Sequence, residues 1–263
     1  MRTQVLYHFP CYDGFGAAFA AWLVFGSDAD YHPCNYGKPL PELPAGAPVR
    51  MIDFSIPREQ LLAMKQMHPD LIVLDHHKTA QADLAGLEFC TFDMNRSGAT
   101  LAYDYFQPVG IGREFFEYLE DRDLWRFKMP GSEEWSAAMR SFPFDFNVWL
   151  NMSMVPSKDL IAEGRSILRY QKQAVATMVD NARLVSIGNV DNVPAVNTCW
   201  LFSEVAHALL AKFPGAPFTV AWYVDGQGIR KYSLRSEDSR MDVSEVAKKL
   251  GGGGHRNAAG FQQ

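Results

Sequence analysis

The sequence predicts an α/β protein with a mostly parallel N-terminal sheet flanked by helices and a smaller α/β C-terminal domain. Over the first 125 residues, short apolar runs alternate with helix-like stretches, which is the pattern of βαβ units. A second pattern of strands and helices begins near Leu184. The composition, 48% hydrophobic and 21% charged over 263 residues, is that of an ordinary globular protein with a sizeable core.

Four short apolar runs predict the strands of the first domain. They are Gln4–His8, Val49–Phe54, Leu71–Leu74 and Cys90–Phe92. Helical patterns lie between and after them, at Gly14–Phe25, Pro57–Met67, Ser97–Phe106 and Arg113–Leu119. Pro57 suits the first turn of its helix because proline fixes φ and lacks an N–H that would have no partner there. The segment Tyr36–Pro48 holds four prolines and is expected to be a loop.

The middle of the chain predicts the boundary between the domains. Residues 130–156 lack a clean period and are expected to form short helices. One long helix is expected over Asp159–Asn181, with Pro156-Ser157 as its N-cap region. These features divide the chain into a first domain, 1–156, a connector helix, 157–185, and a second domain, 186–263. After the long helix, strand patterns lie at Leu184–Ile187, Val193–Asn197, Phe218–Val224 and Lys231–Leu234, and helical patterns lie at Ser203–Lys212 and Val243–Leu250.

Net charge and cysteine use restrict the classes of function. The net charge of −5 argues against a protein that binds duplex DNA non-specifically. The first 185 residues hold 23 acidic and 17 basic side chains and the rest hold 7 and 8, which suits metal ions in the first part and phosphate groups on the second. No apolar run reaches the ~20 residues of a membrane span, and the N-terminus has no signal-peptide pattern. Four cysteines without a CxxC pair favour a reduced, cytoplasmic setting.

Polar side chains follow the first three predicted strands of the first domain. Because the carboxyl ends of parallel strands lie along one edge of a sheet, these side chains are expected to lie close together. They are His8, Cys11 and Asp13 after the first strand, Asp53 after the second, and Asp75, His76 and His77 after the third. The run Glu120-Asp121-Arg122-Asp123 follows a helical pattern and can reach the same edge. Singly, each aspartate has the structural alternative of a helix cap and each histidine that of a core residue.

Carboxylates and imidazoles gathered at one edge repel one another or stay unpaired unless a cation joins them. Oxygen ligands with some imidazole suit Mn²⁺ or Mg²⁺, whereas Zn²⁺ prefers more His and Cys. Asp53 stands alone after its strand, so it is placed to bridge two ions. Two ions about 3.5–4 Å apart clamp the attacking and leaving oxygens in phosphoryl chemistry.

A second cluster lies at the end of the chain. Its sequence is Gly251-Gly252-Gly253-Gly254-His255-Arg256-Asn257-Ala258-Ala259-Gly260. The four glycines let the backbone approach a ligand closely and present its N–H groups. His255 and Arg256 can add charge-assisted hydrogen bonds to phosphate oxygens. A glycine run alone is also typical of a linker, but a linker has no need of the six residues that follow it here.

Together these motifs resemble the DHH phosphoesterase family, in the subfamily with a glycine-rich C-terminal substrate domain. That subfamily includes RecJ-like exonucleases and small oligoribonucleases that also act on adenosine 3′,5′-bisphosphate or linear dinucleotides. The resemblance rests on four motifs in order and spans nearly the whole chain. They are His8-Phe9-Pro10-Cys11-Tyr12-Asp13-Gly14, Asp53 after an apolar run, Asp75-His76-His77, and Gly251 to Gly260.

The resemblance implies two divalent metal ions, with Mn²⁺ expected and Mg²⁺, Co²⁺ or Zn²⁺ as alternatives. The matching ligands are His8, Asp13, Asp53, His76 and one of Asp121 and Asp123. Asp121 is the first choice, because an aromatic residue, Trp125, follows four positions later as in the family's fourth motif. Asp75 matches the residue that orients the third motif, and His77 matches the catalytic residue that faces the substrate phosphate.

The resemblance also implies contacts to substrate phosphate. In the second domain they are Gly252, Gly253, Gly254, His255 and Arg256, with Arg235 from the strand that leads to the glycines. Arg96 lies in a segment that resembles the one after the third motif. Two interpretations of that segment stay open, a substrate contact or part of a helix cap.

The first motif departs from the family at one position. The family usually has two aspartates there, and Cys11 replaces the first. A thiolate is a soft ligand that suits Zn²⁺ better than Mn²⁺. Three outcomes stay open: Cys11 ligates a metal, or it leaves the first site weak and held by His8 and Asp53 alone, or it is inert and the enzyme uses one tightly bound ion.

The implied function is metal-dependent hydrolysis of phosphodiester or phosphomonoester bonds. The substrates would be short single-stranded oligonucleotides or small phosphorylated nucleotides, with no membrane partner and with a homodimer left open. Two alternatives remain. One is an exopolyphosphatase-like phosphohydrolase, and the other is a nucleotide-binding protein with a degenerate metal site, of which Cys11 would be the trace.

Overall fold

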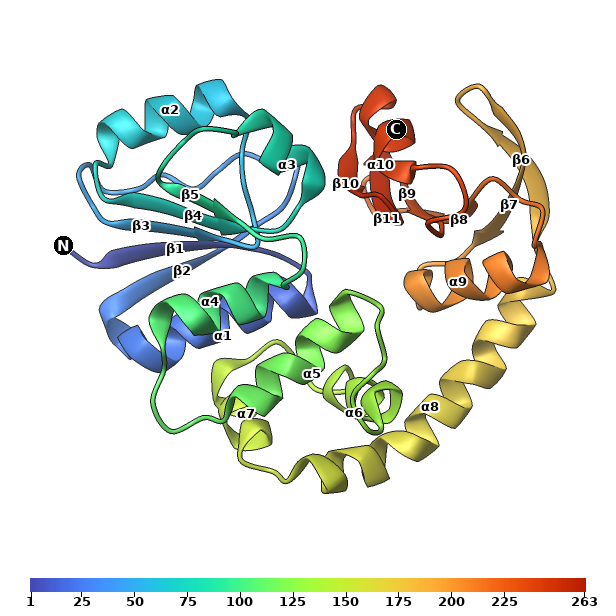
Figure 1. Ribbon diagram of the computed structural model, residues 1–263, viewed down its shortest axis with the longest axis horizontal. Coiled ribbons are helices and arrows are strands. Elements are labelled where there is room, and N and C mark those ends of the chain that lie inside the picture. The colour runs from blue at the N-terminus through green and yellow to red at the C-terminus, as the bar shows by residue number, and fades with distance from the viewer. The chain divides into compact units, whose positions relative to one another are not determined.

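The computed structural model describes all 263 residues, which form two compact units, Met1–Leu168 and Arg169–Gln263. Each unit combines a β-sheet with helices, so the predicted α/β class is confirmed (Figure 1). The division falls within the helix α8 (Ser157–Val179). None of the helices combines the length and the apolar character that crossing a membrane requires.

The first unit is built on five parallel strands in the order β2-β1-β3-β4-β5. They are β1 (Thr3–His8), β2 (Ala29–Cys34), β3 (Val49–Ile52), β4 (Leu71–Asp75) and β5 (Cys90–Phe92). The sequence did not predict β2, because its pattern is short and polar and contains Pro33. Proline is tolerated there because β2 is an edge strand, where one side of the backbone needs no partner strand.

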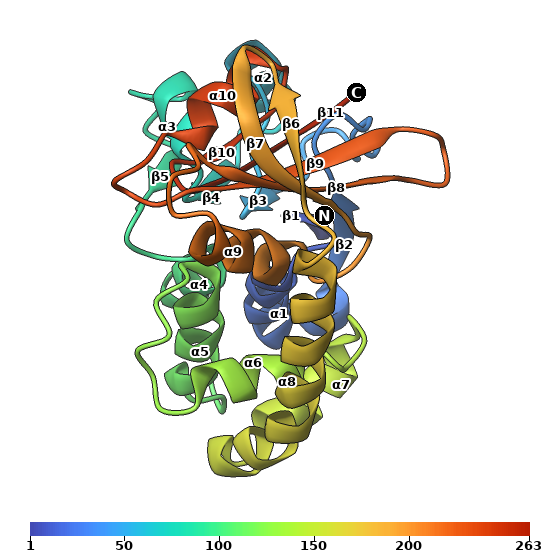
Figure 2. The same ribbon diagram turned by 90° about the vertical axis from the view of Figure 1, so that its right-hand side faces the viewer.

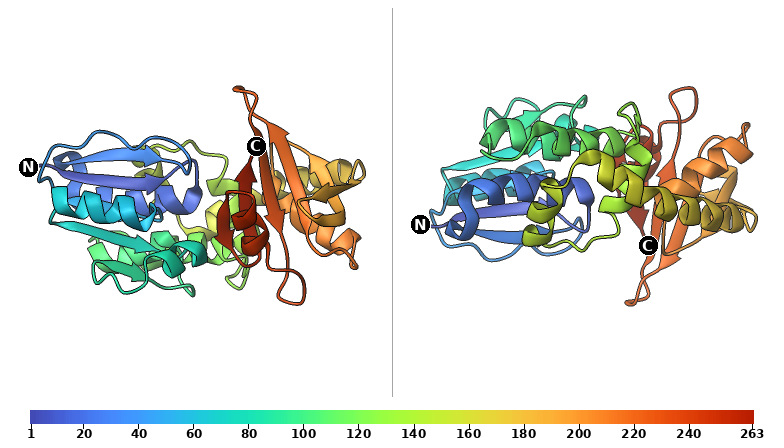
Figure 3. Two further views of the ribbon diagram at one scale, coloured as in Figure 1. Left: turned by 90° about the horizontal axis from the view of Figure 1, so that it is seen from above. Right: turned by 90° about the horizontal axis from the view of Figure 1, so that it is seen from below.

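Helices cover both faces of this sheet, as Figure 3 shows from above and from below. Side chains alternate in direction along a strand, so Val5 and Tyr7 enter one core while Leu6 enters the other. The Leu6 side carries α2 (Arg58–Met67) and α3 (Lys78–Asp83). The opposite side carries α1 (Tyr12–Phe25), α4 (Gly98–Phe106), α5 (Arg113–Asp123), α6 (Ser132–Met139) and α7 (Phe146–Ser153).

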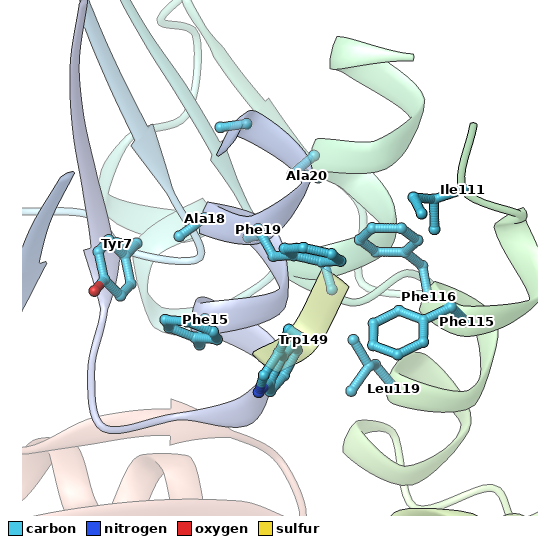
Figure 4. Close-up of a cluster of buried hydrophobic side chains, with 14 of the residues drawn as sticks. Tyr7, Phe15, Ala18, Phe19, Ala20, Ile111, Phe115, Phe116, Leu119 and Trp149 are labelled. Atoms are coloured by element: carbon cyan, nitrogen blue, oxygen red, sulfur yellow. The ribbon is translucent and has the colours of Figure 1, made fainter. Parts of the chain in front are cut away.

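Aromatic side chains fill the core around α1 (Figure 4). Trp149 is fully buried, and its ring meets Phe15 edge-on with 4.8 Å between the ring centroids. Phe19 of the same helix stacks on Phe116 of α5. Because α1 also carries Asp13 in its first turn, this packing fixes the position of that carboxylate.

The second unit is a mixed sheet of six strands in the order β10-β11-β9-β8-β7-β6, in which β7 and β8 pair in parallel and the other neighbours pair antiparallel. The strands are β6 (Arg183–Ile187), β7 (Val190–Asn197), β8 (Thr219–Val224), β9 (Arg230–Arg235), β10 (Gly253–His255) and β11 (Ala258–Gln262). One face packs against α9 (Phe202–Lys212) and the end of α8, and the other against α10 (Val243–Lys249) (Figure 2).

The glycine cluster forms a turn and a hairpin. The turn lies at Gly251, with φ of +81°, and Gly253–His255 is the edge strand β10, paired antiparallel with β11. A Cβ at Gly252 would lie 2.0 Å from the Gly260 carbonyl oxygen, and one at Gly254 would lie 2.6 Å from that of Ala258. Glycine is therefore required here for close packing of two backbones, a structural need that the sequence alone does not separate from ligand binding.

Gly252→Ala is expected to destabilise the second unit. The added Cβ cannot fit unless the backbone near Gly260 moves, at a cost of about 1–3 kcal/mol. The thermal unfolding midpoint, followed by circular dichroism, should fall by several degrees. Gly226→Ala is the control, since nothing lies within 4 Å of a Cβ there, and an equal midpoint for both variants would contradict the argument.

Candidate metal centre

The candidate site lies at the carboxyl edge of the first sheet, where β1 and β3 are neighbours (Figure 1). From β1 the chain passes to β2 on one side, and from β3 it passes to β4 on the other. Such a reversal of strand order opens a crevice at the carboxyl ends of the strands, the place where open α/β sheets bind ligands. His8 ends β1 and Asp53 directly follows β3, so both flank this crevice.

Asp53 is held in a strained conformation. Its φ is +51°, a left-handed value that is uncommon for a residue with a side chain, and its N–H donates to the Leu74 carbonyl oxygen at 2.8 Å. A Cβ at Gly98 of α4 would lie 2.4 Å from the Asp53 Cβ. The absence of a side chain at Gly98 therefore makes the room in which the Asp53 carboxylate lies. Backbone strain of this kind clusters at functional sites.

The Asp53 carboxylate is buried, with 1% of the residue exposed, and neither oxygen accepts a well-aligned hydrogen bond. Its closest cationic neighbours are His76, whose Nε2 lies 3.1 Å from Oδ1, and His8, whose Nδ1 lies 3.6 Å from Oδ2. Burial opposes ionisation, but the two imidazoles hold the pKa of Asp53 well below its usual range. A charged carboxylate is thus kept inside the protein with incomplete pairing.

Asp13 is held by the N-terminus of α4. Its carboxylate accepts hydrogen bonds from the backbone N–H groups of Gly98, at 2.6 Å, and Ala99, at 3.0 Å. Ser97 caps the same helix in a reciprocal arrangement with Thr100. The positive end of the helix dipole stabilises the Asp13 carboxylate, and Oδ2 lies 3.4 Å from Nε2 of His76.

Asp75 orients the two histidines that follow it. It is fully buried and accepts hydrogen bonds from Ser55 Oγ, the His76 backbone N–H and His77 Nδ1, each at 2.7 Å. Burial raises the pKa of Asp75, but the His77 imidazole outweighs it and lowers that pKa overall. The hydrogen bond at Nδ1 fixes the ring of His77, so Nε2 is the atom that His77 can turn to a ligand.

Three groups of possible ligand atoms lie in the first unit, of which Asp53, Asp75 and His77 form one. Two more lie beside it. One contains His8, Cys11 and Asp53, and the other contains Asp13, His76 and Asp123; within each group all ligand atoms lie within 4.8 Å of one another. Burial and the Asp13 carboxylate raise the pKa of Asp123 to about 7, against the effect of His76. Burial and the nearby carboxylates likewise raise the pKa of the Cys11 thiol well above its usual value. The nearby carboxylates therefore oppose a further negative charge on Asp123 or Cys11.

Asp121, the expected ligand, points away from the cluster. Its carboxylate accepts hydrogen bonds from the backbone N–H groups of Lys128, at 2.9 Å, and Met129, at 3.0 Å, and so closes the loop after α5. Asp123 lies 3.7 Å from Nε2 of His76. Two residues apart on a helix are about 200° apart around its axis, so the two side chains cannot face the same site. The aromatic spacing could not separate them, because Phe127 also follows Asp123 by four positions.

Arg96 is engaged in a structural network. Its guanidinium binds Glu120 at 2.8 Å and Asp104 at 2.9 Å. Glu120 also accepts hydrogen bonds from the Ser97 N–H, at 3.0 Å, and from the Thr100 hydroxyl. These contacts fix the first turn of α4, so the interpretation of Arg96 as part of a helix cap fits the geometry.

The candidate residues of the second unit have partners within that unit. Arg235 donates to Ser203 Oγ at 2.7 Å. Arg256 donates to the Asp238 carbonyl oxygen at 2.9 Å and lies 3.4 Å from Oδ2 of Asp242. His255 ends the edge strand β10.

One aromatic residue of the site was not predicted from the sequence. Tyr36 lies in the proline-rich loop after β2, with its ring centroid 5.3 Å from that of His8 and 5.9 Å from that of His77. Its ring also packs on Phe54, at 5.0 Å, and 42% of the residue is exposed. No local pattern marks a single tyrosine in a loop, so only the fold could bring it to these histidines.

Comparison with known proteins yields one relative by sequence, and no protein-family model matches the chain. The relative is the uncharacterized protein R106 of Acanthamoeba polyphaga mimivirus, which is 34% identical over 280 aligned positions. The match covers 98% of this chain and 66% of that protein, so the chain spans just under two thirds of the relative's length. Because that protein is itself uncharacterized, the likeness carries no function to this chain.

Two solved structures are similar along nearly the whole chain. One is a pGpG-specific phosphodiesterase from Vibrio cholerae, with a TM-score of 0.51 and 13% identity, covering 100% of this chain and 93% of that one. The other is an exopolyphosphatase-related protein from Bacteroides fragilis, with a TM-score of 0.51 and 14% identity, covering 98% and 86%. At these identities the likeness shows a common fold.

Gly98→Ala is expected to disturb the candidate site more than the core. The new Cβ would lie 2.4 Å from the Asp53 Cβ, so Asp53 must move out of its place between the imidazoles. Affinity for Mn²⁺, measured by titration calorimetry, should fall at least about tenfold, while the far-ultraviolet circular dichroism stays as in the unmodified chain. Gly112→Ala, where a Cβ meets nothing within 4 Å, should keep that affinity. Equal affinities in the two variants would contradict the role given to Gly98.

Proposed function

We propose that the chain is a metal-dependent phosphoester hydrolase of the DHH phosphoesterase type. The observation that carries the proposal is the buried Asp53 carboxylate, whose two oxygens lie beside the imidazoles of His8 and His76 without a well-aligned hydrogen bond. A buried, incompletely paired charge costs several kcal/mol unless a partner compensates it. A divalent cation on each side of Asp53 is the partner that these donors fit.

The proposed ligands divide between two ions. His8 and Asp53 would hold one, and Asp13, His76 and Asp123 would hold the other. Asp53 Oδ1 also lies 3.1 Å from Nε2 of His76 and so is near the second group. Carboxylate oxygen with some imidazole suits Mn²⁺, with Mg²⁺ and Co²⁺ as alternatives. We leave Asp121 out of the proposed metal ligands, because its carboxylate accepts a backbone hydrogen bond from Lys128. We leave Arg96 out of the proposed substrate contacts, because its guanidinium binds Glu120.

The proposed reaction is attack of water on the phosphorus of a phosphoester. When bound, divalent ions would lower the pKa of the attacking water and offset the negative charge of the phosphoryl oxygens. His77 is the proposed catalytic residue: Asp75 holds its Nδ1, so Nε2 can donate to a phosphoryl oxygen as charge develops on it. Asp75 acts on His77 and His76 by fixing their orientation.

The proposed substrates are short single-stranded oligonucleotides or small phosphorylated nucleotides. Two structures of similar fold carry related activities in their names, a phosphodiesterase specific for the dinucleotide pGpG and an exopolyphosphatase-related protein. In the second unit, we assign contacts with a terminal phosphate to the edge strand β10 with its preceding glycines, to Arg256 and to Arg235. Backbone N–H groups of an edge strand, with basic side chains nearby, are suited to an anion.

The decisive experiment is a substrate panel assayed with Mn²⁺. It contains a linear dinucleotide, a 5′-phosphorylated trinucleotide RNA, adenosine 3′,5′-bisphosphate and polyphosphate. Hydrolysis of one of the three nucleotides is expected, and Asp53→Asn should lower kcat/KM at least about a thousandfold, roughly 4 kcal/mol of transition-state stabilisation. Binding of nucleotide without hydrolysis under any divalent ion would overturn the proposal, and hydrolysis of polyphosphate alone would favour the exopolyphosphatase-like alternative.

A matched pair of variants tests the choice between the two aspartates of α5. Asp123→Asn should weaken Mn²⁺ binding at least about tenfold, because it removes a charge beside His76. Asp121→Asn should keep Mn²⁺ affinity and instead lower the unfolding midpoint, because Asp121 closes the loop at Lys128 and Met129. The opposite pattern of affinities would return the ligand role to Asp121.

A further inference from the structure

Cys11 brings a thiol into a cluster of carboxylates and imidazoles. It is the N-cap residue of α1, but its side chain makes no capping hydrogen bond. Its sulfur, a ring nitrogen of His8 and a carboxylate oxygen of Asp53 all lie within 4.8 Å of one another. These three atoms are therefore close enough to share one ion.

Cys34, by contrast, has the surroundings of a cysteine whose role is packing in an apolar core. It lies in the apolar core with Leu6 and Val49, and its thiol donates to the His32 carbonyl oxygen at 3.4 Å. Cys11 is not a member of either apolar core of the first unit and lies beside a buried carboxylate instead. A thiol whose sole role was packing would gain nothing from that position.

A second, independent observation is that His8 and Asp53, the other two residues of the group, have buried polar atoms without hydrogen bonds. The Asp53 carboxylate is 1% exposed and neither oxygen accepts a hydrogen bond, and Nδ1 of His8 has no hydrogen-bond partner either. Polar atoms buried in this way are normally paired. Three ligand atoms gathered together, with no hydrogen bond at Nδ1 of His8 or at either oxygen of Asp53, indicate a cation between them.

We propose that Cys11 is a thiolate ligand of the ion held by His8 and Asp53, so that the two metal sites differ in chemistry. The inference rests on the two-ion site of the proposed function. The His8–Cys11–Asp53 site takes a thiophilic ion, Zn²⁺ or Co²⁺, and the Asp13–His76–Asp123 group, which offers oxygen and nitrogen only, takes Mn²⁺ or Mg²⁺. As the sulfur–metal bond forms, the thiol proton leaves to solvent.

Absorption spectroscopy during Co²⁺ titration tests the bond directly. A sulfur-to-cobalt charge-transfer band in the near ultraviolet is expected for the unmodified chain and for the control Cys199→Ser, whose cysteine is exposed. Cys11→Ser should lose the band. The triple variant Cys34→Ser, Cys90→Ser, Cys199→Ser keeps Cys11 as its one cysteine and must show the band, so the test holds even if Cys11→Ser fails to fold. A triple variant that binds Co²⁺ without the band overturns the proposal.

Metal selectivity gives a second readout that does not depend on catalysis. Replacement of the soft ligand by a hard one, Cys11→Asp, should lower the affinity for Zn²⁺ relative to Mn²⁺ at least about tenfold in titration calorimetry. Cys199→Ser should leave the ratio unchanged. An unchanged ratio in Cys11→Asp would also overturn the proposal.

The two proposals fail in distinguishable ways. Absence of the charge-transfer band from the unmodified chain, with Mn²⁺-dependent hydrolysis present, would remove the Cys11 ligand and keep the phosphoesterase. The band without hydrolysis of any phosphoester would keep the thiolate site and remove the proposed reaction. Absence of Co²⁺, Zn²⁺ and Mn²⁺ binding altogether would overturn both.

Discussion

The arrangement of the first unit depends on one constraint, the placing of the buried Asp53 carboxylate at the point where the strand order reverses. Asp53 adopts a left-handed backbone conformation there. Two glycines, one in α4 and one in α1, allow these helices to approach the ends of β3 and β1 closely. Gly98 leaves space for the Asp53 side chain, and a Cβ at Gly14 would lie 2.1 Å from the His8 carbonyl oxygen. The cost in backbone strain is of order 1–3 kcal/mol, and the aromatic core around α1 is large enough to offset it.

A second set of residues supports the proposed ligands from behind. Glu120 receives hydrogen bonds from the Ser97 N–H, the Thr100 hydroxyl and Arg96, and this fixes the first turn of α4. Two backbone N–H groups of that first turn then donate hydrogen bonds to the Asp13 carboxylate. Glu120 is thus a positioning residue, which acts on the candidate site through the helix and not through contact with it. The same logic applies to Asp75, whose hydrogen bonds set the rings of the two histidines.

The sequence predicted the elements whose signal is local and missed those that depend on tertiary context. Apolar runs ending in Asp or His identified three strands and the edge at which their side chains meet, because parallel strands share that edge. The polar edge strand β2 was missed, since Pro33 is compatible with a strand only where a partner is absent on one side. The hairpin of β10 and β11 was missed because glycine permits a loop as readily as a close-packed strand pair. The choice between Asp121 and Asp123 needed the direction of each side chain on α5, which spacing alone does not contain.

The arginines proposed to hold phosphate differ in how easily they can exchange partners. Arg96 has 24% of its side chain exposed and binds Glu120 and Asp104 at 2.8 and 2.9 Å, so a phosphate would have to break a network that also supports α4. Arg256 has 44% of its side chain exposed and lies 3.4 and 3.7 Å from the carboxylates of Asp242 and Asp238. Exposed pairs of that geometry contribute roughly 0–1 kcal/mol, and a doubly charged phosphate competes well with each of them. Arg256 can therefore change partners at little cost, which is why it stays in the proposed site while Arg96 does not.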